Sequence, residues 1–358
     1  SEVDPNSIGA NEVYFLCIDR EGTLWIGTDS GGLNRYNPEQ DNFTRYLNPN
    51  DSTALANTII IVIADKSGML WLGTHHGGLH SFNPKTEKFT SYFNIPSDST
   101  SLSHNYIWTL HEDSKGNIWI GTIGGGLNKF NRESQTFTRY QHNPKNTNSI
   151  SSDLVPGICE DKSGSLWIGT YGGGINKLTF NGDNDSAVFT HFKFDPLNPN
   201  GVSGDNIDCI LIDKNNVLWF GTSQTGLNRS ISNLDDDSPL SVISYKHDPY
   251  DQSSLAGNSI RQLYEDDEGV YWISSYGGLN IFHSKQKPFR NYKHEVGNLF
   301  SLQGDYVISL CEDKSGIIWL GTQNGGLNRW DRKTDKIVNF INDPNNPGRI
   351  YFSGKGLD

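Results

Sequence analysis

The pentapeptide LWIGT at Leu24–Thr28 recurs six more times along the chain, as LWLGT, IWIGT, LWIGT, LWFGT, YWISS and IWLGT. Successive tryptophans of these copies lie 46, 48, 48, 52, 53 and 47 residues apart. Seven units averaging 49 residues therefore account for nearly all of the 358 residues and leave no room for a second domain. Seven of the nine tryptophans are one position of this repeat, namely Trp25, Trp71, Trp119, Trp167, Trp219, Trp272 and Trp319.

Each unit contains the same order of short segments. An apolar segment such as VYFLCI comes first, an Asp stands six residues before the tryptophan, and the tryptophan segment follows. A Gly-containing turn then leads into segments such as GLNRY and NFTRY, and a loop rich in Asn, Pro, Ser and Asp leads into the next unit. Alternating β-branched and aromatic residues indicate strands throughout, without a 3.6-residue period. The sequence therefore predicts an all-β fold, a seven-bladed β-propeller with four antiparallel strands per blade.

The boundaries and the packing follow from the same repeat. We expect one propeller over residues 1–348, with residues 349–358 as a tail, an added closing strand or the start of a following domain. The residues twelve and nine positions before each tryptophan are always aliphatic, which predicts seven inter-blade layers in place of one central core. The anchor tryptophans are interpreted as filling the widening wedge between blades, without a direct role in function.

The cysteines repeat at one position too. Cys17, Cys159 and Cys311 each stand eight residues before their tryptophan, and Cys209 lies on the inner strand of the fifth unit. We take the equivalent positions to lie on non-adjacent blades, where the side chains cannot pair. The prediction is therefore buried free thiols.

Composition narrows the class of protein. The formal net charge is −12 and no run of Lys and Arg offsets it locally, which argues against nucleic acid as a partner. No apolar stretch approaches the ~20 residues that a membrane helix requires, and Ser1 does not begin a signal peptide. No motif calls for a cofactor, so none is expected.

The units resemble the two-component regulator propeller repeat, in which an acidic-Asp-x-x-Gly turn precedes LWIGT and GGLN. Such turns stand at residues 112–116, 160–164 and 312–316. The GGLN element stands at residues 31–34, 125–128 and 325–328 and, one position early relative to its tryptophan, at residues 277–280. The resemblance extends over all seven units.

The resemblance implies a ligand-binding sensor propeller that belongs to a bacterial membrane receptor and lies in the periplasm. In that family a membrane helix and an output module such as a histidine kinase or a diguanylate cyclase follow, and several members are thought to respond to oligosaccharides. This sequence carries neither segment, so we expect it to be part of a longer receptor. Any membrane contact would be made through the other segments, and a homodimer of the full receptor stays open.

Candidate binding positions are those at which the seven units differ on the face that carries the unit-to-unit loops. Four positions qualify: thirteen and eleven residues before the tryptophan, and four and five residues after it. Aromatic faces beside Arg, acidic and amide groups suit a small polar ligand such as an oligosaccharide. The alternative is that the aromatic residues only cap the inter-blade layers. The predicted site residues are Tyr14, Asp29, His75, His76, Tyr106, Trp108, Tyr171, Asp208, Arg261, Tyr276, Tyr306, Gln323 and Asn324.

Other readings are weighed against this one. His75, His76 and His80 form an HHxxxH cluster, but His80 stands where six units carry Asn, so it is interpreted as structural and no metal is predicted. The segment at residues 216–220 is similar to the repeat of streptogramin lyases, which are metal-dependent propeller enzymes with a His general base. No such base with an acidic partner is evident here, so no catalytic residue is predicted. A protein-interaction platform on the same face remains a third hypothesis.

Overall fold

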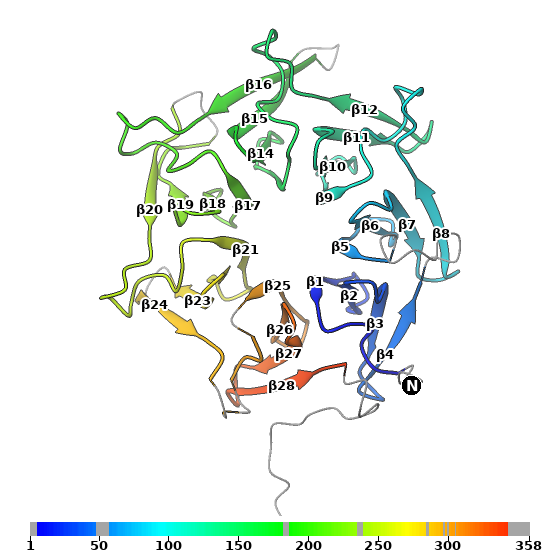
Figure 1. The fold of residues 1–358 in the computed structure, drawn as a ribbon, viewed down its shortest axis with the longest axis vertical. Coiled ribbons are helices and arrows are strands. Elements are labelled where there is room, and N and C mark those ends of the chain that lie inside the picture. The colour runs from blue at the N-terminus through cyan, green and yellow to red at the C-terminus, as the bar shows by residue number, and fades with distance from the viewer. Residues whose placement is uncertain are drawn as a thin grey trace, which may run out of the picture.

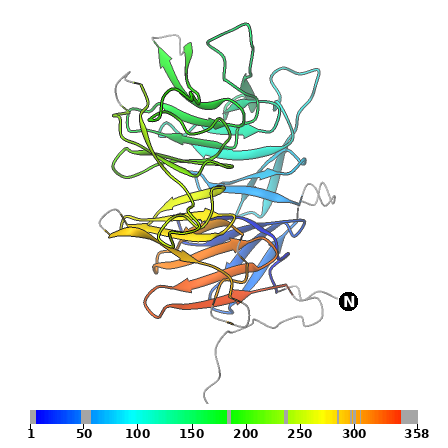
Figure 2. The same cartoon turned by 60° about the vertical axis from the view of Figure 1, so that its left-hand side comes forward.

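A computed structural model describes residues 6–47, 57–181, 186–234, 239–283, 286–295, 298, 301–304 and 306–342. Every element within these ranges is a β-strand, and the strands form seven four-stranded antiparallel sheets arranged around a central axis (Figure 1). The turned view shows the blades side by side in a ring with loops projecting from it (Figure 2). The predicted fold class is confirmed, whereas residues 349–358 lie outside the described part of the chain.

The four strands of each blade follow one another in the sequence from the axis outward. The innermost strands are β1 (Val13–Ile18), β5 (Ile59–Ala64), β9 (Ile107–Glu112), β13 (Gly157–Glu160), β17 (Ile207–Ile212), β21 (Ile260–Glu265) and β25 (Val307–Glu312). The second strands are β2 (Leu24–Thr28), β6 (Leu70–Thr74), β10 (Ile118–Thr122), β14 (Leu166–Thr170), β18 (Leu218–Thr222), β22 (Val270–Ser275) and β26 (Ile317–Thr322). The third strands are β3 (Leu33–Asn37), β7 (Leu79–Asn83), β11 (Leu127–Asn131), β15 (Gly174–Asn181), β19 (Leu227–Ser230), β23 (Gly278–His283) and β27 (Gly326–Asp331). The outer strands are β4 (Asn42–Tyr46), β8 (Lys88–Tyr92), β12 (Thr136–Tyr140), β16 (Ser186–Phe192), β20 (Val242–Tyr245), β24 (Gln286–Tyr292) and β28 (Lys336–Phe340).

The Asp of each unit closes the turn between the first two strands. In the fourth blade, Oδ1 of Asp161 accepts hydrogen bonds from the backbone N–H groups of Ser163 and Ser165, both at 2.9 Å. Its Oδ2 accepts the indole N–H of Trp167 at 2.8 Å. The indole-to-Asp bond recurs in all seven blades at 2.8–2.9 Å. The conserved spacing of Asp and Trp within the repeat is therefore a direct bond.

The fourth residue of this turn has a positive φ, which glycine adopts at no steric cost. Gly164 has a φ of 83°, and its N–H donates to the carbonyl of Asp161 at 2.9 Å. In the fifth blade, Asn216 takes the same conformation with a φ of 63°. Asn tolerates the left-handed region better than most residues, which explains the single exception to the glycine.

The apolar side chains form seven separate layers, as predicted. Each layer contains one anchor tryptophan, which packs against the next blade in the ring. Trp25 of the first blade, for example, lies with Ile59, Val62 and Phe82 of the second. Trp319 of the seventh blade lies with Val13 of the first, so the last layer closes the ring.

Among the described strands, none is exchanged between the two ends of the ring. The first blade consists entirely of β1–β4 and the seventh entirely of β25–β28, and the two lie side by side in Figure 1. Across this seam, Gly326 N–H donates to the carbonyl of Asn11 at 2.9 Å, and Asn342 N–H donates to Oδ1 of Asn11 at 2.5 Å. Between the third and fourth blades, the residues at the same positions form the same pair of bonds, from Gly126 and His142 to Asp153.

The four cysteines are free, as predicted, but for a different reason. Cys17 and Cys311 lie on neighbouring blades, because ring closure places the seventh blade next to the first, so the expectation that they are not adjacent was wrong. Cys311 belongs to the layer between the seventh and first blades, whereas Cys17 packs against the layer between the first and second. The two thiols therefore point into different layers, on opposite sides of β1.

Candidate functional site

The inner strands share an irregularity at the position eleven residues before the tryptophan. In six of the seven blades, the register with the second strand skips one inner-strand residue. Such a β-bulge leaves the extra residue out of the ladder and re-aims its side chain. In the fourth blade, Pro156 occupies this position directly before the first paired residue, Gly157. We call these seven positions the bulge residues: Tyr14, Ile60, Trp108, Pro156, Asp208, Arg261 and Ile308.

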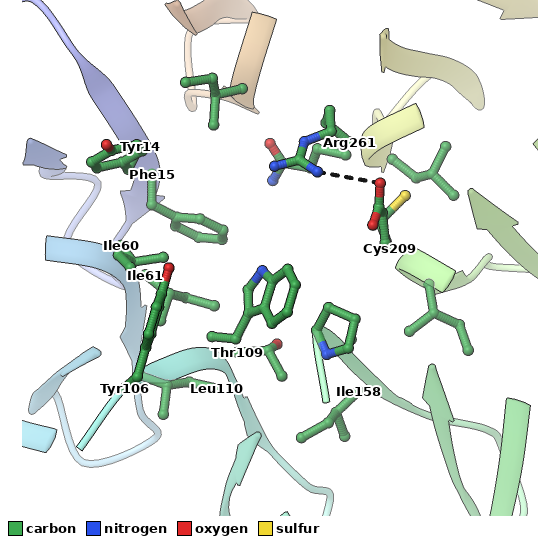
Figure 3. Close-up of a pocket in the computed structure, with 18 of the residues that line it drawn as sticks. Tyr14, Phe15, Ile60, Ile61, Tyr106, Thr109, Leu110, Ile158, Cys209 and Arg261 are labelled. Atoms are coloured by element: carbon green, nitrogen blue, oxygen red, sulfur yellow. Dashed lines mark hydrogen bonds and ion pairs between the residues drawn. The ribbon is translucent and has the colours of Figure 1, made fainter. Parts of the chain in front are cut away.

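All seven bulge residues line one cavity on the propeller axis, the central cavity (Figure 3). Its volume is about 380 Å³, which lies within the range of small-molecule sites. Residues one and two positions further along the inner strands complete the lining, among them Phe15, Thr109, Gln262 and the aliphatic Leu110 and Leu263. The cavity is thus lined by residues of the innermost strands and by His75 and Tyr106 from the loops above them.

One half of the central cavity is aromatic. Tyr14, Phe15, Tyr106 and Trp108 come from the first and third blades and from the loop before β9, and the labelled rings lie on the same side of the opening in Figure 3. Trp108 also lies 6.1 Å from the ring of Tyr171, measured between ring centroids. These rings offer apolar faces to a ligand, with hydroxyl and indole N–H groups at their edges.

Burial shapes the chemistry of these tyrosines. It raises the pKa of Tyr14 to about 12, and the neighbouring carboxylates of Glu12 and Asp29 add to the shift. Burial also raises the pKa of Tyr106, against the opposing effect of the Arg261 cation. Both phenols therefore stay protonated at neutral pH and can donate hydrogen bonds.

The opposite half of the cavity carries an ion pair. Nη1 of Arg261 lies 3.2 Å from Oδ2 of Asp208, the contact drawn as a dashed line in Figure 3. The Asp208 side chain is only 3% exposed, whereas that of Arg261 is 34% exposed. Burial raises the pKa of Asp208, although Arg261 opposes the shift. The second carboxylate oxygen, Oδ1, is buried and has no hydrogen-bond partner among the described residues.

The structure divides the thirteen predicted site residues into two groups. Six line the central cavity: Tyr14, His75, Tyr106, Trp108, Asp208 and Arg261. The other seven lie outside its lining, and we call them the rim residues: Asp29, His76, Tyr171, Tyr276, Tyr306, Gln323 and Asn324.

Several rim residues contact the cavity residues or each other. His76 lies 4.9 Å from the ring of Tyr106, and Tyr306 lies 5.8 Å below the guanidinium of Arg261. Tyr276, 64% exposed, packs against Tyr306 in a tilted arrangement, with 4.3 Å between the ring centroids.

The polar rim residues bond within the loops. Asp29 accepts a hydrogen bond from the hydroxyl of Thr58 at 2.9 Å, and Gln323 donates to Glu12 at 2.9 Å. Asn324 is an exposed turn residue with a φ of 62°. The side chains of Asp29 and Gln323 therefore join loop segments around the mouth and do not form the cavity wall.

Sequence reasoning missed lining residues of two kinds. Ile60, Pro156 and Ile308 occupy the selected position but are not polar or aromatic, so they were not proposed. Phe15 and Gln262 lie one residue beyond a bulge, where simple strand alternation predicts a side chain that points away from the axis. A bulge has no clear sequence signature here, so alternation alone could not place these residues.

No metal centre is formed by the described residues, since no group of three His, Cys, Asp or Glu side chains among them could hold an ion. His80 is structural, as predicted: it is 1% exposed and its ring Nδ1 lies 2.8 Å from the hydroxyl of Ser91. Within the ranges that the structure describes, no helix is long and apolar enough to cross a membrane.

Comparison with known families gives one result. The two component regulator propeller repeat matches residues 7–30, 101–124, 149–172, 201–224, 254–277 and 301–324, that is, six of the seven units. Six units of the chain are two component regulator propeller repeats. No curated protein sequence matches this regulator propeller.

Solved structures share the fold of this regulator propeller. The extracellular domain of a putative hybrid two component system from B. thetaiotaomicron superimposes with a TM-score of 0.71 at 23% identity and covers 89% of the chain, which spans 40% of that domain. PorZ, a surface component of the type-IX secretion system of Porphyromonas gingivalis, gives a TM-score of 0.68 at 16% identity over 89% of the propeller and 46% of PorZ. A streptogramin B lyase gives a TM-score of 0.64 at 13% identity over 91% of the propeller and 95% of the lyase.

Proposed function

We propose that this chain is the ligand-binding sensor propeller of a bacterial membrane signalling receptor. Six of its units are two component regulator propeller repeats, and one structure with the same fold is an extracellular domain of a putative hybrid two component system. The sensor acts outside the cytoplasm, in the periplasm, and segments beyond this chain supply the membrane anchor and the output module. A homodimer of the full receptor is compatible with this arrangement.

We further propose that the central cavity binds a small polar ligand, with an oligosaccharide as the favoured class. The observation that supports this most directly is the identity of the bulge residues. They occupy the same position in every blade and converge on one cavity, yet only Ile60 and Ile308 share a residue type, although the packing positions around them repeat. A ring of identical structural positions with different side chains is expected where the side chains serve recognition.

The chemistry of the two halves suits a sugar. Tyr14, Tyr106 and Trp108 present ring faces that can stack on the C–H faces of a pyranose. Arg261 and Asp208 lie opposite, where they can donate to and accept from ring hydroxyls. One ligand that spans the cavity would use both halves at once.

An enzyme is the second candidate, because a streptogramin B lyase has the same fold. A lyase of that kind needs a divalent metal and a general base. The described residues supply no cluster of three metal ligands. His75, the one histidine of the cavity lining, packs edge-to-face against His76 and at a tilt against Tyr106. We therefore favour binding without turnover, and expect no cleavage of a streptogramin B antibiotic by the purified propeller with added Mg²⁺.

Calorimetry tests the binding proposal. A glycan array identifies the oligosaccharide that the wild-type propeller retains, and its affinity is then compared with those of Trp108→Ala and Arg261→Ala. Each substitution should weaken binding about tenfold or more, because it removes a stacking face or a charged donor, each worth ~1–2 kcal/mol.

The control is Tyr250→Ala, which removes a 96% exposed aromatic ring far from the cavity lining and should leave affinity unchanged. Unaltered affinity in both cavity variants would show that the ligand binds elsewhere. If no glycan is retained while a peptide or protein partner is, the interaction-platform hypothesis replaces this one.

A further inference from the structure

The charges around the central cavity are unevenly distributed. Among the described lining residues, Arg261 is the only Lys or Arg and Asp208 the only Asp or Glu, and the two form an ion pair with each other. The cavity wall is therefore close to neutral overall. Behind the wall, Glu12 and Asp29 lie near enough to Tyr14 to raise its pKa, after the larger effect of burial. The electrostatic potential on the aromatic side of the cavity mouth, near Tyr14, is therefore negative.

Asp208 lines this cavity and has a buried acceptor that is not used by the described residues. Its side chain is 3% exposed, its Oδ2 faces Arg261 at 3.2 Å, and its Oδ1 has no hydrogen-bond partner within the part of the chain that the structure describes. A buried carboxylate oxygen without a donor is unfavourable, so a ligand that supplies a donor recovers that free energy. A hydroxyl or an ammonium group can supply the donor; a carboxylate or a sulfate cannot.

Arg261 does not offset this preference. Its charge is already engaged by Asp208, and its guanidinium lies over the ring of Tyr306 at 5.8 Å. An anionic ligand group that approached Arg261 would also approach the Asp208 carboxylate, in a poorly solvated site where like charges repel strongly.

We propose that the central cavity selects oligosaccharides whose bound end presents hydrogen-bond donors and carries no negative charge, and that Asp208 imposes this selection. This inference rests on the proposed function, since it specifies the ligand of the same cavity. Neutral and amino sugars meet the requirement, whereas uronic acids and sulfated sugars do not.

The experiment uses three groups of trisaccharide probes with the intact chain. The neutral probes are cellotriose, xylotriose and mannotriose, the amino probe is the glucosamine trimer, and the acidic probe is trigalacturonate. Wild type should bind at least one neutral or amino probe and should bind trigalacturonate at least tenfold more weakly. Asp208→Asn keeps the side-chain shape but leaves the Arg261 cation uncompensated. It should lose at least tenfold in affinity for the wild-type ligand and bind trigalacturonate more tightly than wild type does.

Asp267→Asn is the matched control, because it removes one negative charge from a side chain that is 95% exposed and outside the cavity lining. It should bind every probe as wild type does. Near-identical thermal unfolding of wild type, Asp208→Asn and Asp267→Asn would show that Asp208→Asn is folded. A further variant, Arg261→Gln, removes the cation that faces Asp208. It should bind trigalacturonate still more weakly than wild type does.

The outcomes separate the two proposals. Binding of trigalacturonate by wild type in preference to the other probes would overturn the charge selection and leave the sugar-binding function intact. Trigalacturonate binding by Asp208→Asn that is no tighter than in wild type would also overturn it. Failure of every probe to bind would remove the oligosaccharide function itself, and the inference with it.

Discussion

The anchor tryptophan of each blade is held from more than one direction. Its indole N–H donates to the turn Asp, and in four blades a Lys or Arg of the third strand lies over its ring, 5.3–5.9 Å from the centroid. In the fourth blade, the indole N–H of Trp167 donates to Asp161, and the ammonium group of Lys177 lies over its ring. The basic residue that often follows GGLN thus contributes a cation–π contact to the inter-blade layer. The sequence shows that the Asp, the Trp and the cation recur together, but not that they meet.

Removal of the turn Asp should destabilise the propeller strongly. Asp161→Ala deletes acceptors for two backbone N–H groups and leaves the buried indole N–H of Trp167 unsatisfied. We expect a loss of about 2–4 kcal/mol in the free energy of unfolding, measured by chemical denaturation. Asp195→Ala is the comparison, since its exposed carboxylate accepts one loop N–H, from Leu197. Equal effects of the two substitutions would contradict the structural importance of the Asp–Trp bond.

At the scale of the strand, the inner strands accept different residues at the position eight before the tryptophan. Cys17, Leu211 and Cys311 occupy it in other blades, whereas His111 occupies it in β9. Burial lowers the pKa of His111 to about 4; Asp113 opposes the shift and Lys66 adds to it. The imidazole is therefore neutral in the folded protein at pH 5 to 7.

His111 should make stability fall in mildly acidic solution. The unfolded chain takes up a proton near pH 6.5, but the folded protein resists protonation of this ring until about pH 4. Its contribution to stability is therefore complete above pH 6.5 and is lost as the pH falls towards 4, by up to about 3 kcal/mol. His111→Leu, which places the residue of the fifth blade here, should show a smaller decrease in unfolding free energy between pH 7 and pH 4. Parallel pH profiles for the two proteins would contradict the assignment.

The strand scale also marks the limit of what the sequence predicts. The four segments of each unit, the Asp turn and the aliphatic packing positions were all readable, because each recurs seven times. The position eleven residues before the tryptophan could be chosen from the sequence because it varies between units. The structure places the residues at this position in one cavity, among them Tyr14, Trp108, Asp208 and Arg261. The bulge that turns these side chains inward is a property of register between two strands, so a pattern within one strand could not reveal it. The Asp208–Arg261 pair joins two blades and depends on the same register.

For the whole molecule, the seam between the first and last blades joins two blades, β1–β4 and β25–β28, that are not consecutive in the sequence. It is held by the bonds of Asn11 to Gly326 and Asn342 and by the layer around Trp319. The sequence predicted a ring but not its closure, and so misjudged the adjacency of Cys17 and Cys311. In a closed ring of seven blades, the first blade is the neighbour of the seventh, although these two units lie farthest apart in the sequence.

Because the first and seventh blades are not consecutive in the sequence, we expect the seam between them to be more sensitive to the loss of a hydrogen bond than a junction between consecutive blades. Asn11→Ala removes the side-chain bonds to Asn342 N–H and carbonyl, at 2.5 and 2.7 Å, and should cost about 1–2 kcal/mol. It should also speed amide hydrogen exchange in β1 and β25, on both sides of the seam. Asn105→Ala removes the equivalent bond to Asn94 N–H, at 2.6 Å, where the chain itself joins the two blades. We expect a smaller and more local effect there; the reverse order would show that the seam is not the weakest joint.

The bulges of the inner strands have a consequence for how such a propeller can change in evolution. A residue outside the hydrogen-bonded ladder contributes little to the stability of its blade. Residues as different as proline, isoleucine, tryptophan, aspartate and arginine therefore occur at this one position. Single mutations there can alter specificity while the layers and turns that hold the blades stay under separate selection. If the cavity binds a ligand as proposed, point substitutions at these seven positions can change which ligand it binds while the packing of the blades is kept.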